Sequence, residues 1–254
     1  MTMSLTIVNS FTSRPFSGNP AAVALCDSYP DDARLQAIAA EINLSETAFL
    51  VARDDDSFSL RWFSPAVEVD LCGHATLASA HVLNRPASFH TRAGRLDCTI
   101  GSDGWIEMDF PADPPEAQQL PDSVDVPVHS YFGLARHFAL IEVKDAAAVR
   151  AYVSDPTLPG RLGSKGLIVT AAGDREGIDC VSRVFVPGVG IPEDPVTGSA
   201  HCVLAVYWGE RLGVDALMGE QASARGGIVG MRLLGDRVVL RGEAVTVALT
   251  EFVV

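Results

Sequence analysis

Apolar and polar residues alternate along many short segments of this chain, a pattern that predicts half-buried β-strands. Phe58, Leu60 and Trp62, for example, alternate with polar neighbours. The other strands expected from this pattern are short and rich in apolar residues, and they cover residues 4–8, 21–25, 48–52 and 244–254. The pattern leaves open whether the last of these strands closes the second half of the chain or crosses back to the first.

Three segments have the apolar periodicity of helices instead. Residues 31–42 place apolar side chains, from Leu35 to Ile42, on one face, and their first turn is acidic, which favours a helix start. Residues 75–83 and 200–208 are apolar around nearly the whole circumference. Because a helix that is apolar on all sides must be buried, we expect a sheet to wrap each of these two helices.

The chain contains the same order of motifs twice. An Arg-X-Phe-X-Pro segment is followed by an acidic stretch, then by a Gly-X-Ala step into an apolar helix, and then by a glycine-centred hairpin. The three motifs are residues 61–65, 73–75 and 91–94 in the first copy and residues 183–187, 198–200 and 224–227 in the second. A duplicated unit of this kind predicts two similar lobes, and clefts between lobes are common sites for small ligands.

These elements predict an α+β fold with two pseudo-symmetric lobes, each a curved, mostly antiparallel sheet or barrel around a central apolar helix. The proline-rich residues 111–115 interrupt both helices and strands, so they are the expected linker. We therefore expect an N-terminal lobe of residues 1–115 and a C-terminal lobe of residues 116–254, with the return of the last strand to the first lobe left open.

Composition narrows the possible partners. The 254 residues are 48% hydrophobic and 20% charged, which is typical of a soluble globular protein. The formal net charge is −13, and the chain has only two lysines, Lys144 and Lys165. Because no basic stripe is present, we expect neither nucleic acid nor an anionic membrane as a partner.

Cysteine usage indicates a reducing compartment. The five cysteines are widely spaced and include no C-x-x-C pair, so the spacing indicates neither a disulfide framework nor a zinc site. The first sixteen residues contain no apolar run long enough for a signal peptide or a membrane span. A cytoplasmic location is the resulting expectation.

The glycine steps stand where the two apolar helices begin. Free backbone N–H groups and the helix dipole make such a start an anion site without any Lys or Arg. We therefore expect a carboxylate to bind near Gly73-His74 and Gly198-Ser199. In a simpler interpretation the glycines only form tight turns, and Thr197 or Ser199 only caps a helix. The recurrence of the step at matching points of the repeat favours the anion site.

Four side chains are candidates for acid–base chemistry. Glu46 lies in a short polar loop, and burial can raise the pKa of a glutamate toward neutrality, although the pattern alone favours an exposed loop carboxylate. His74 and Asp194 have similarly simple structural interpretations, as a capping group and a solvated turn residue. Cys72 stands at a helix N-terminus, where the pKa of a thiol falls. The second copy has Thr197 at the matching place, so a symmetrical two-thiol mechanism lacks a partner for Cys72.

Five segments together resemble the phenazine-biosynthesis PhzF-like family, which shares its two-lobed fold with diaminopimelate epimerase. The segments extend from near the start of the chain to its second hairpin. They are FTSRPFSGNPAAVAL at residues 11–25, NLSETAF at 43–49, RWFSPAVEVDLCGHATLASA at 61–80, EDPVTGSAHC at 193–202 and QASARGG at 221–227.

The resemblance implies a barrel-like sheet around the helix of each lobe and a cofactor-independent isomerase whose site lies in the cleft between the lobes. It implies that Glu46 is the catalytic acid–base and that His74 and Asp194 contact the substrate. The expected substrate-binding residues in the matched turns are Asn19, Gly73, Gly198 and Ser199. The resemblance also implies a small carboxylate-bearing substrate, a homodimer, and neither a cofactor nor a metal ion.

Two other functions remain open at this point. The first is an amino-acid racemase or epimerase that uses Cys72, which the missing second cysteine opposes. The second is a binding protein that kept the cleft for small carboxylates but lost turnover. The joint presence of Glu46, His74 and Asp194 argues against the binding protein, since binding alone requires no proton carrier.

Overall fold

The computed structural model describes residues 2–122 and 124–253, which form two compact units. Unit 1 contains the chain up to Asp109 together with the segment that starts at Arg241, and unit 2 contains Phe110–Leu240. This division differs from the one expected at residue 115. The predicted linker lies in unit 2, because a strand continues through Pro111, and the last strand belongs to unit 1.

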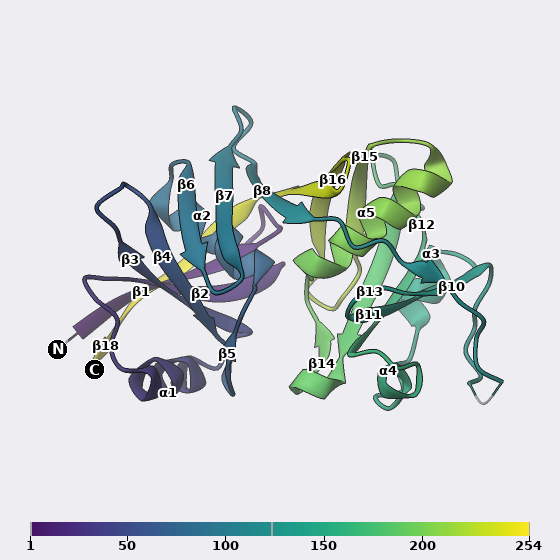
Figure 1. Cartoon of the computed structure of the whole chain (residues 1–254), viewed down its shortest axis with the longest axis horizontal. Coiled ribbons are helices and arrows are strands. Elements are labelled where there is room, and N and C mark those ends of the chain that lie inside the picture. Colours follow the sequence, from purple (N-terminus) through teal and green to yellow (C-terminus); the bar gives the residue numbers. More distant parts are fainter. Residues whose placement is uncertain (1, 123, 254) are drawn as a thin grey trace. The chain divides into compact units, whose positions relative to one another are not determined.

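Unit 1 is a sheet with two helices (Figure 1). Its helices are α1 (Asp32–Ile42) and α2 (Gly73–Leu83). Its strands are β1 (Thr2–Ser10), β2 (Asn19–Cys26), β3 (Glu46–Ala52), β4 (Phe58–Phe63), β5 (Glu68–Val69), β6 (Ala87–Thr91), β7 (Gly94–Ile100) and β18 (Ala244–Val253). Two further strands, β8 (Ile106–Pro111) and β17 (Arg237–Gly242), pass from one unit into the other.

Helical crossovers decide which strands of unit 1 are parallel. The strands β2 and β3 are parallel and are joined through α1, and β4 and β6 are parallel and are joined through α2. The other pairs of consecutive strands, β1 with β2, β3 with β4, β4 with β5, β6 with β7 and β7 with β8, are antiparallel. A parallel pair needs a long connection, which a helix supplies, whereas antiparallel strands need only a short turn.

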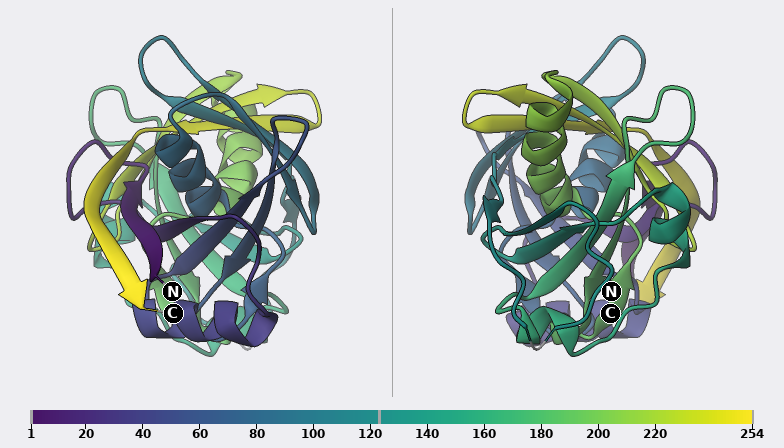
Figure 2. Two further views of the ribbon diagram at one scale, coloured as in Figure 1. Left: turned by 90° about the vertical axis from the view of Figure 1, so that its left-hand side faces the viewer. Right: turned by 90° about the vertical axis from the view of Figure 1, so that its right-hand side faces the viewer.

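Strand β18 completes unit 1 from the far end of the chain. It pairs antiparallel with β1 from Thr2 opposite Val253 to Ser10 opposite Ala244. Figure 2 (left) shows β18, in yellow, running beside β1, in purple. The crossing back that the sequence left open therefore takes place, and it brings both ends of the described chain into unit 1.

Unit 2 has more elements but repeats the same plan. Its helices are α3 (Ala146–Ala151), α4 (Leu158–Arg161) and α5 (Gly198–Leu212), with a 3₁₀ turn at Pro187–Val189. Its strands are β9 (Glu116–Ala117), β10 (Tyr131–Leu134), β11 (Phe138–Glu142), β12 (Gly166–Ala172), β13 (Cys180–Val186), β14 (Ile191–Asp194), β15 (Ala216–Gln221) and β16 (Gly227–Leu234).

The strand pairings of unit 2 reproduce those of unit 1 in order and direction. The strands β11 and β12 are parallel, β12 and β13 antiparallel, β13 and β15 parallel through α5, and β15 and β16 antiparallel. The same series of parallel and antiparallel pairings joins β2, β3, β4, β6 and β7 in unit 1. The duplication seen in the sequence is therefore a duplication of topology, in which α5 takes the place of α2.

Both apolar helices are buried, as their composition predicts. Every residue of α2 from His74 to Ala80 is buried, and most of α5 between Ala200 and Gly209 is buried as well. Both helices start two residues earlier than predicted, because the glycine of each step already forms the first turn. The helix α5 also continues to Leu212, where Gly213 ends it in a left-handed conformation with a φ of 69°.

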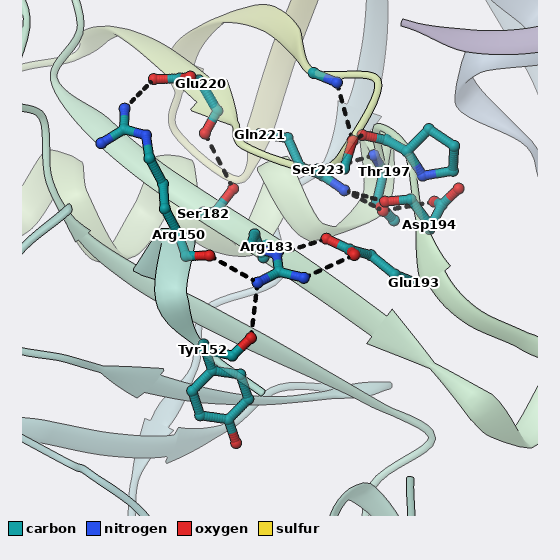
Figure 3. A network of polar contacts seen from close by, with 12 residues as sticks. Arg150, Tyr152, Ser182, Arg183, Glu193, Asp194, Thr197, Glu220, Gln221 and Ser223 are labelled. Carbon is teal, nitrogen blue, oxygen red and sulfur yellow. Dashed lines mark hydrogen bonds and ion pairs between the residues drawn. The ribbon is translucent and has the colours of Figure 1, made fainter. Parts of the chain in front are cut away.

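One charged interaction recurs in both units. The guanidinium of Arg61 binds both carboxylate oxygens of Glu68 at 2.7 and 2.8 Å, and that of Arg183 binds both oxygens of Glu193 at 2.7 and 2.8 Å. Each Arg connects a long strand to the short strand that leads to the buried helix. Figure 3 shows the second pair, where Arg183 also donates to the backbone carbonyl of Tyr152 at 2.7 Å.

We expect Arg183→Lys to lower the free energy of unfolding by about 1–2 kcal/mol, because lysine cannot form the bidentate contact with Glu193. Arg161→Lys is the matched control, since the pair of Arg161 with Asp155 is far more exposed, at 43% and 46%, and should lose less than about 0.5 kcal/mol. Urea unfolding of the two variants provides the comparison. Equal losses would contradict a special role for the Arg183 pair.

Candidate functional site

Three elements of unit 1 bring four candidate residues together. Asn19 is the first residue of β2, Glu46 is the first residue of β3, and His74 is the second residue of α2, directly after Gly73. Because β2 and β3 are parallel, their first residues lie at the same end of the two strands, where Ala21 pairs with Glu46. Glu46 is thus a strand residue and not the exposed loop carboxylate that the pattern favoured.

His74 is the centre of this group. Its Nε2 lies 3.1 Å from Oε2 of Glu46, and its Nδ1 lies 3.2 Å from the Asn19 amide nitrogen and 3.5 Å from Sγ of Cys72. The side chains of His74 and Glu46 are only 6% and 13% exposed. Because Asn19 and the thiol donate to Nδ1 in the neutral ring, the ring proton belongs on Nε2, toward Glu46.

The contact between His74 and Glu46 is close but leaves a donor unused. Although 3.1 Å is an ion-pair distance, the direction of the ring does not meet hydrogen-bond geometry, and within the described residues Nε2 has no hydrogen-bond partner. A buried N–H without an acceptor is costly, so such a group commonly serves a ligand. The unused donor stands directly beside the Glu46 carboxylate.

Burial and charge act in opposite directions on His74. Burial by itself lowers the pKa of the imidazole, but negative charge on Cys72 and Glu46 and the contacts with them raise this pKa well above its usual 6.5. The two neighbours of the His74 ring, and not burial alone, therefore set its pKa.

Cys72 does not have the lowered pKa expected at a helix N-terminus. Burial raises the pKa of its thiol, and the charge of Glu46 raises it further, while His74 and the backbone N–H of Ala75 only partly oppose this. Desolvation of a thiolate therefore outweighs the helix start, and Cys72 is a thiol in the folded protein.

Neither helix start is capped by the side chain that precedes it. Cys72 and Thr197 stand at the N-cap positions of α2 and α5, and neither side chain forms a cap hydrogen bond. The Thr197 hydroxyl instead donates to Oδ2 of Asp194 at 2.5 Å. The interpretation of Thr197 as a helix cap is therefore wrong, and Gly198 and the exposed Ser199 begin an uncapped helix.

A buried glutamine that sequence reasoning missed holds this second helix start. Oε1 of Gln221 accepts from the backbone N–H of Thr197 at 2.8 Å, and its Nε2 donates to the backbone carbonyl of Asp194 at 2.6 Å. Figure 3 shows the Gln221 amide reaching both residues from β15. Gln221 is fully buried, and its place in one of the family-like segments was the available signal.

Each helix start is also fixed from inside its first turn. Thr76 donates its hydroxyl to the carbonyl of Cys72 at 2.6 Å, and His201 donates from Nδ1 to the carbonyl of Thr197 at 2.8 Å. The two residues occupy the same place in the repeat. Burial lowers the pKa of His201 to about 4, so its ring is neutral at ordinary pH.

The structure thus forms two groups from the predicted site residues. Unit 1 brings Asn19, Glu46, Gly73 and His74 together, and unit 2 places Asp194 beside the Gly198-Ser199 helix start. The cleft expected between the lobes stays a prediction. Among the described residues, no helix is both long and apolar enough to cross a membrane.

Comparison with known proteins matches almost the whole chain. A family model described as "Phenazine biosynthesis-like protein" matches residues 8–249. An uncharacterized isomerase from Halalkalibacterium halodurans is 42% identical, over 99% of this chain and 98% of that protein. The crystal structure of a PhzF-family phenazine biosynthesis protein from Enterococcus faecalis covers 100% of both chains, with 37% identity and a TM-score of 0.94.

A more distant likeness concerns the fold alone. A hydroxyproline epimerase from Agrobacterium vitis has a TM-score of 0.72 at 11% identity, over 98% of this chain and 92% of that chain. Together these comparisons confirm the expected α+β fold class with its epimerase-like plan, and the isomerase relative confirms the expected enzyme class.

Because His201 is buried and neutral, we expect the folded protein to lose stability as the pH falls. Its pKa of about 4 lies below the value of about 6.5 of an unfolded histidine, so the unfolded chain takes up the proton first as the pH falls. Stability that is complete above about pH 6.5 is therefore lost toward pH 4, by on the order of 3 kcal/mol.

We expect His201→Gln to remove this part of the acid sensitivity, even if the variant is less stable at pH 7. Urea unfolding at pH 7 and pH 4.5 measures the difference for each protein. His137→Gln, at an exposed histidine, is the control and should leave the difference unchanged. If the free energy of unfolding changes equally between pH 7 and pH 4.5 in the parent and in His201→Gln, the assignment is contradicted.

Proposed function

This chain belongs to the family of phenazine biosynthesis-like proteins, and we propose that it is an isomerase that moves a proton between carbon atoms of a small carboxylate-bearing metabolite. The family resemblance seen in the sequence and the isomerase class are confirmed by the comparisons. The observation that carries the proposal is the contact between Glu46 and His74, in which a carboxylate lies 3.1 Å from a buried imidazole.

Glu46 is the group proposed to carry the proton. Its side chain is 13% exposed, so it can be reached from outside, while its neighbour His74 is buried. One carboxyl group can take a proton from one carbon and deliver it to another if the substrate is held in line with it. Such a transfer needs neither a cofactor nor a metal ion.

His74 is proposed to polarise the substrate. The ring proton on Nε2 has no aligned acceptor within the described residues. A donor of this kind beside the acid–base stabilises negative charge that develops on a substrate carboxylate or enolate. Asn19 and Cys72 contact the other ring nitrogen, so they hold the orientation of the ring.

The start of α5 is proposed to bind the substrate carboxylate. The backbone N–H of Thr197 is already bonded to Gln221, and the helix begins at Gly198 without a side-chain cap. The N–H groups of Gly198 and Ser199 therefore suit an anion. Asp194, whose carboxylate is held by Thr197, would face that anion only if one of the carboxyl groups keeps a proton.

A racemase or epimerase that uses Cys72 is the second candidate. The 3.5 Å contact between its Sγ and Nδ1 of His74 favours it, because an imidazole can exchange a proton with a thiol at this distance. The raised pKa of Cys72 and the presence of Thr197 in the second copy oppose it. The homodimer and the cytoplasmic location expected from the sequence stay predictions.

We expect Glu46→Gln to lose deuterium incorporation from D₂O into product by about 10²–10⁴-fold, because glutamine keeps the shape of the side chain but exchanges no proton. The assay is mass spectrometry of a panel of small unsaturated and amino carboxylates incubated with the enzyme. Glu41→Gln, at an exposed glutamate of α1, is the control and should behave like the parent. Parent-like exchange by Glu46→Gln would refute the assignment.

Cys72→Ser separates the two candidate functions in the same assay. A proton carrier at Glu46 predicts a loss of no more than about tenfold, since serine retains a small group beside His74. A Cys72 epimerase predicts a loss of several orders of magnitude with folding intact. Near-UV circular dichroism of the variant verifies the fold, so a large loss in a folded variant would favour the second candidate.

A further inference from the structure

The side chains around His74 also form a set of metal-binding atoms. Ligand atoms of Glu46, Cys72 and His74 all lie within 4.8 Å of one another, and across the described part of the chain no other His, Cys, Asp or Glu trio does so. We propose that these three residues form a binding site for Zn²⁺. Zinc at this site would inhibit the isomerase by occupying Glu46, a consequence that rests on the function proposed above.

The distances already approach those of a zinc site. Two ligands of a tetrahedral zinc, with bonds of about 2.3 Å to sulfur and about 2.05 Å to nitrogen, lie about 3.6 Å apart. Sγ of Cys72 and Nδ1 of His74 are separated by 3.5 Å. An ion bound to both atoms needs little movement of either side chain. The Glu46 carboxylate now lies beside Nε2, within 4.8 Å of the other ligand atoms, so it must leave Nε2 to become the third ligand.

Backbone contacts hold two of the ligands in place. The Ser10 hydroxyl donates to the carbonyl of His74 at 2.7 Å, and Thr76 fixes the carbonyl of Cys72. Binding at Nδ1 breaks the contact with the Asn19 amide, which is the local cost of taking up the ion. Preorganised ligands reduce the remaining cost, because few rotatable bonds must be frozen when the metal enters.

Charge and ligand type both select zinc. Zn²⁺ binds the Cys72 thiolate, the neutral His74 ring and the Glu46 carboxylate, so two negative charges balance the ion in a buried place. The thiol proton, and the second imidazolium proton where present, leave to solvent. Sulfur, nitrogen and oxygen ligands suit zinc, whereas Mg²⁺ and Ca²⁺ require oxygen atoms. Three protein ligands leave a fourth position for water, as in open zinc sites.

Sequence spacing could not reveal this set. Cys72 and His74 are two residues apart at the start of α2, but Glu46 comes from β3 and reaches them only in the folded unit. Its side chain is also the most exposed of the three, so the ion can enter past the carboxylate. Zinc bound to Glu46 then occupies the carboxylate lone pair that would otherwise accept a proton from the substrate.

The test uses the purified full chain without any substrate. Co²⁺ is the spectroscopic probe, because a cobalt–thiolate bond gives a charge-transfer absorption that identifies the sulfur ligand, and Zn²⁺ affinity follows from competition with bound Co²⁺. We expect one equivalent of Co²⁺ to produce this band in the parent. The variants are Cys72→Ser, Glu46→Gln and, as the control, Cys26→Ser at a half-buried thiol elsewhere in unit 1.

Cys72→Ser should lose the band and weaken Zn²⁺ binding by at least about a hundredfold, more than the 10–100-fold typical of losing a partner of a ligand. Glu46→Gln should keep the band with weaker affinity, and Cys26→Ser should match the parent. A band that survives in Cys72→Ser, or that disappears in Cys26→Ser, would overturn the site, as would a parent that binds no ion. Since no turnover is measured, failure here is distinct from failure of the Glu46 mechanism.

Discussion

The burial of two wholly apolar helices is the constraint on which this structure depends. A helix without a polar face cannot lie on a surface, so each unit curves its sheet around one such helix. The burial also fixes where each helix begins, because a glycine step leads from a short strand into the core. Both starts keep backbone N–H groups without a side-chain cap, and the candidate site residues lie beside them.

The two copies kept the architecture and diverged in chemistry. Both retain the paired Arg and Glu that hold the strand before the helix. At the first residue of β3 the first copy has Glu46, whereas β12 begins with Gly166. A Cβ atom at Gly166 would lie 2.8 Å from Val186 and 2.9 Å from Phe138, so the second copy has no room for a glutamate without rearrangement. Acid–base groups are thus concentrated in unit 1.

Two buried histidines show how local partners decide charge. Burial disfavours the charged ring of both His74 and His201. His74 nevertheless has a raised pKa, because Cys72 and Glu46 lie beside it, whereas His201 contacts only a backbone carbonyl and has a lowered pKa. The same residue type at two matching helix starts therefore has its pKa shifted in opposite directions.

The sequence by itself determined the repeat, the buried helices and most strands, and its family-like segments supplied the candidate site residues. Those features follow from local periodicity and from matched motifs, which a linear chain displays directly. Only the tertiary structure decided the pairing of β18 with β1, the parallel strand pairs, the position of Glu46 beside His74, and the hydrogen bonds of Gln221 to the start of α5. Each of these joins residues far apart in the chain, and the free energy of such contacts depends on burial and geometry that no local pattern encodes.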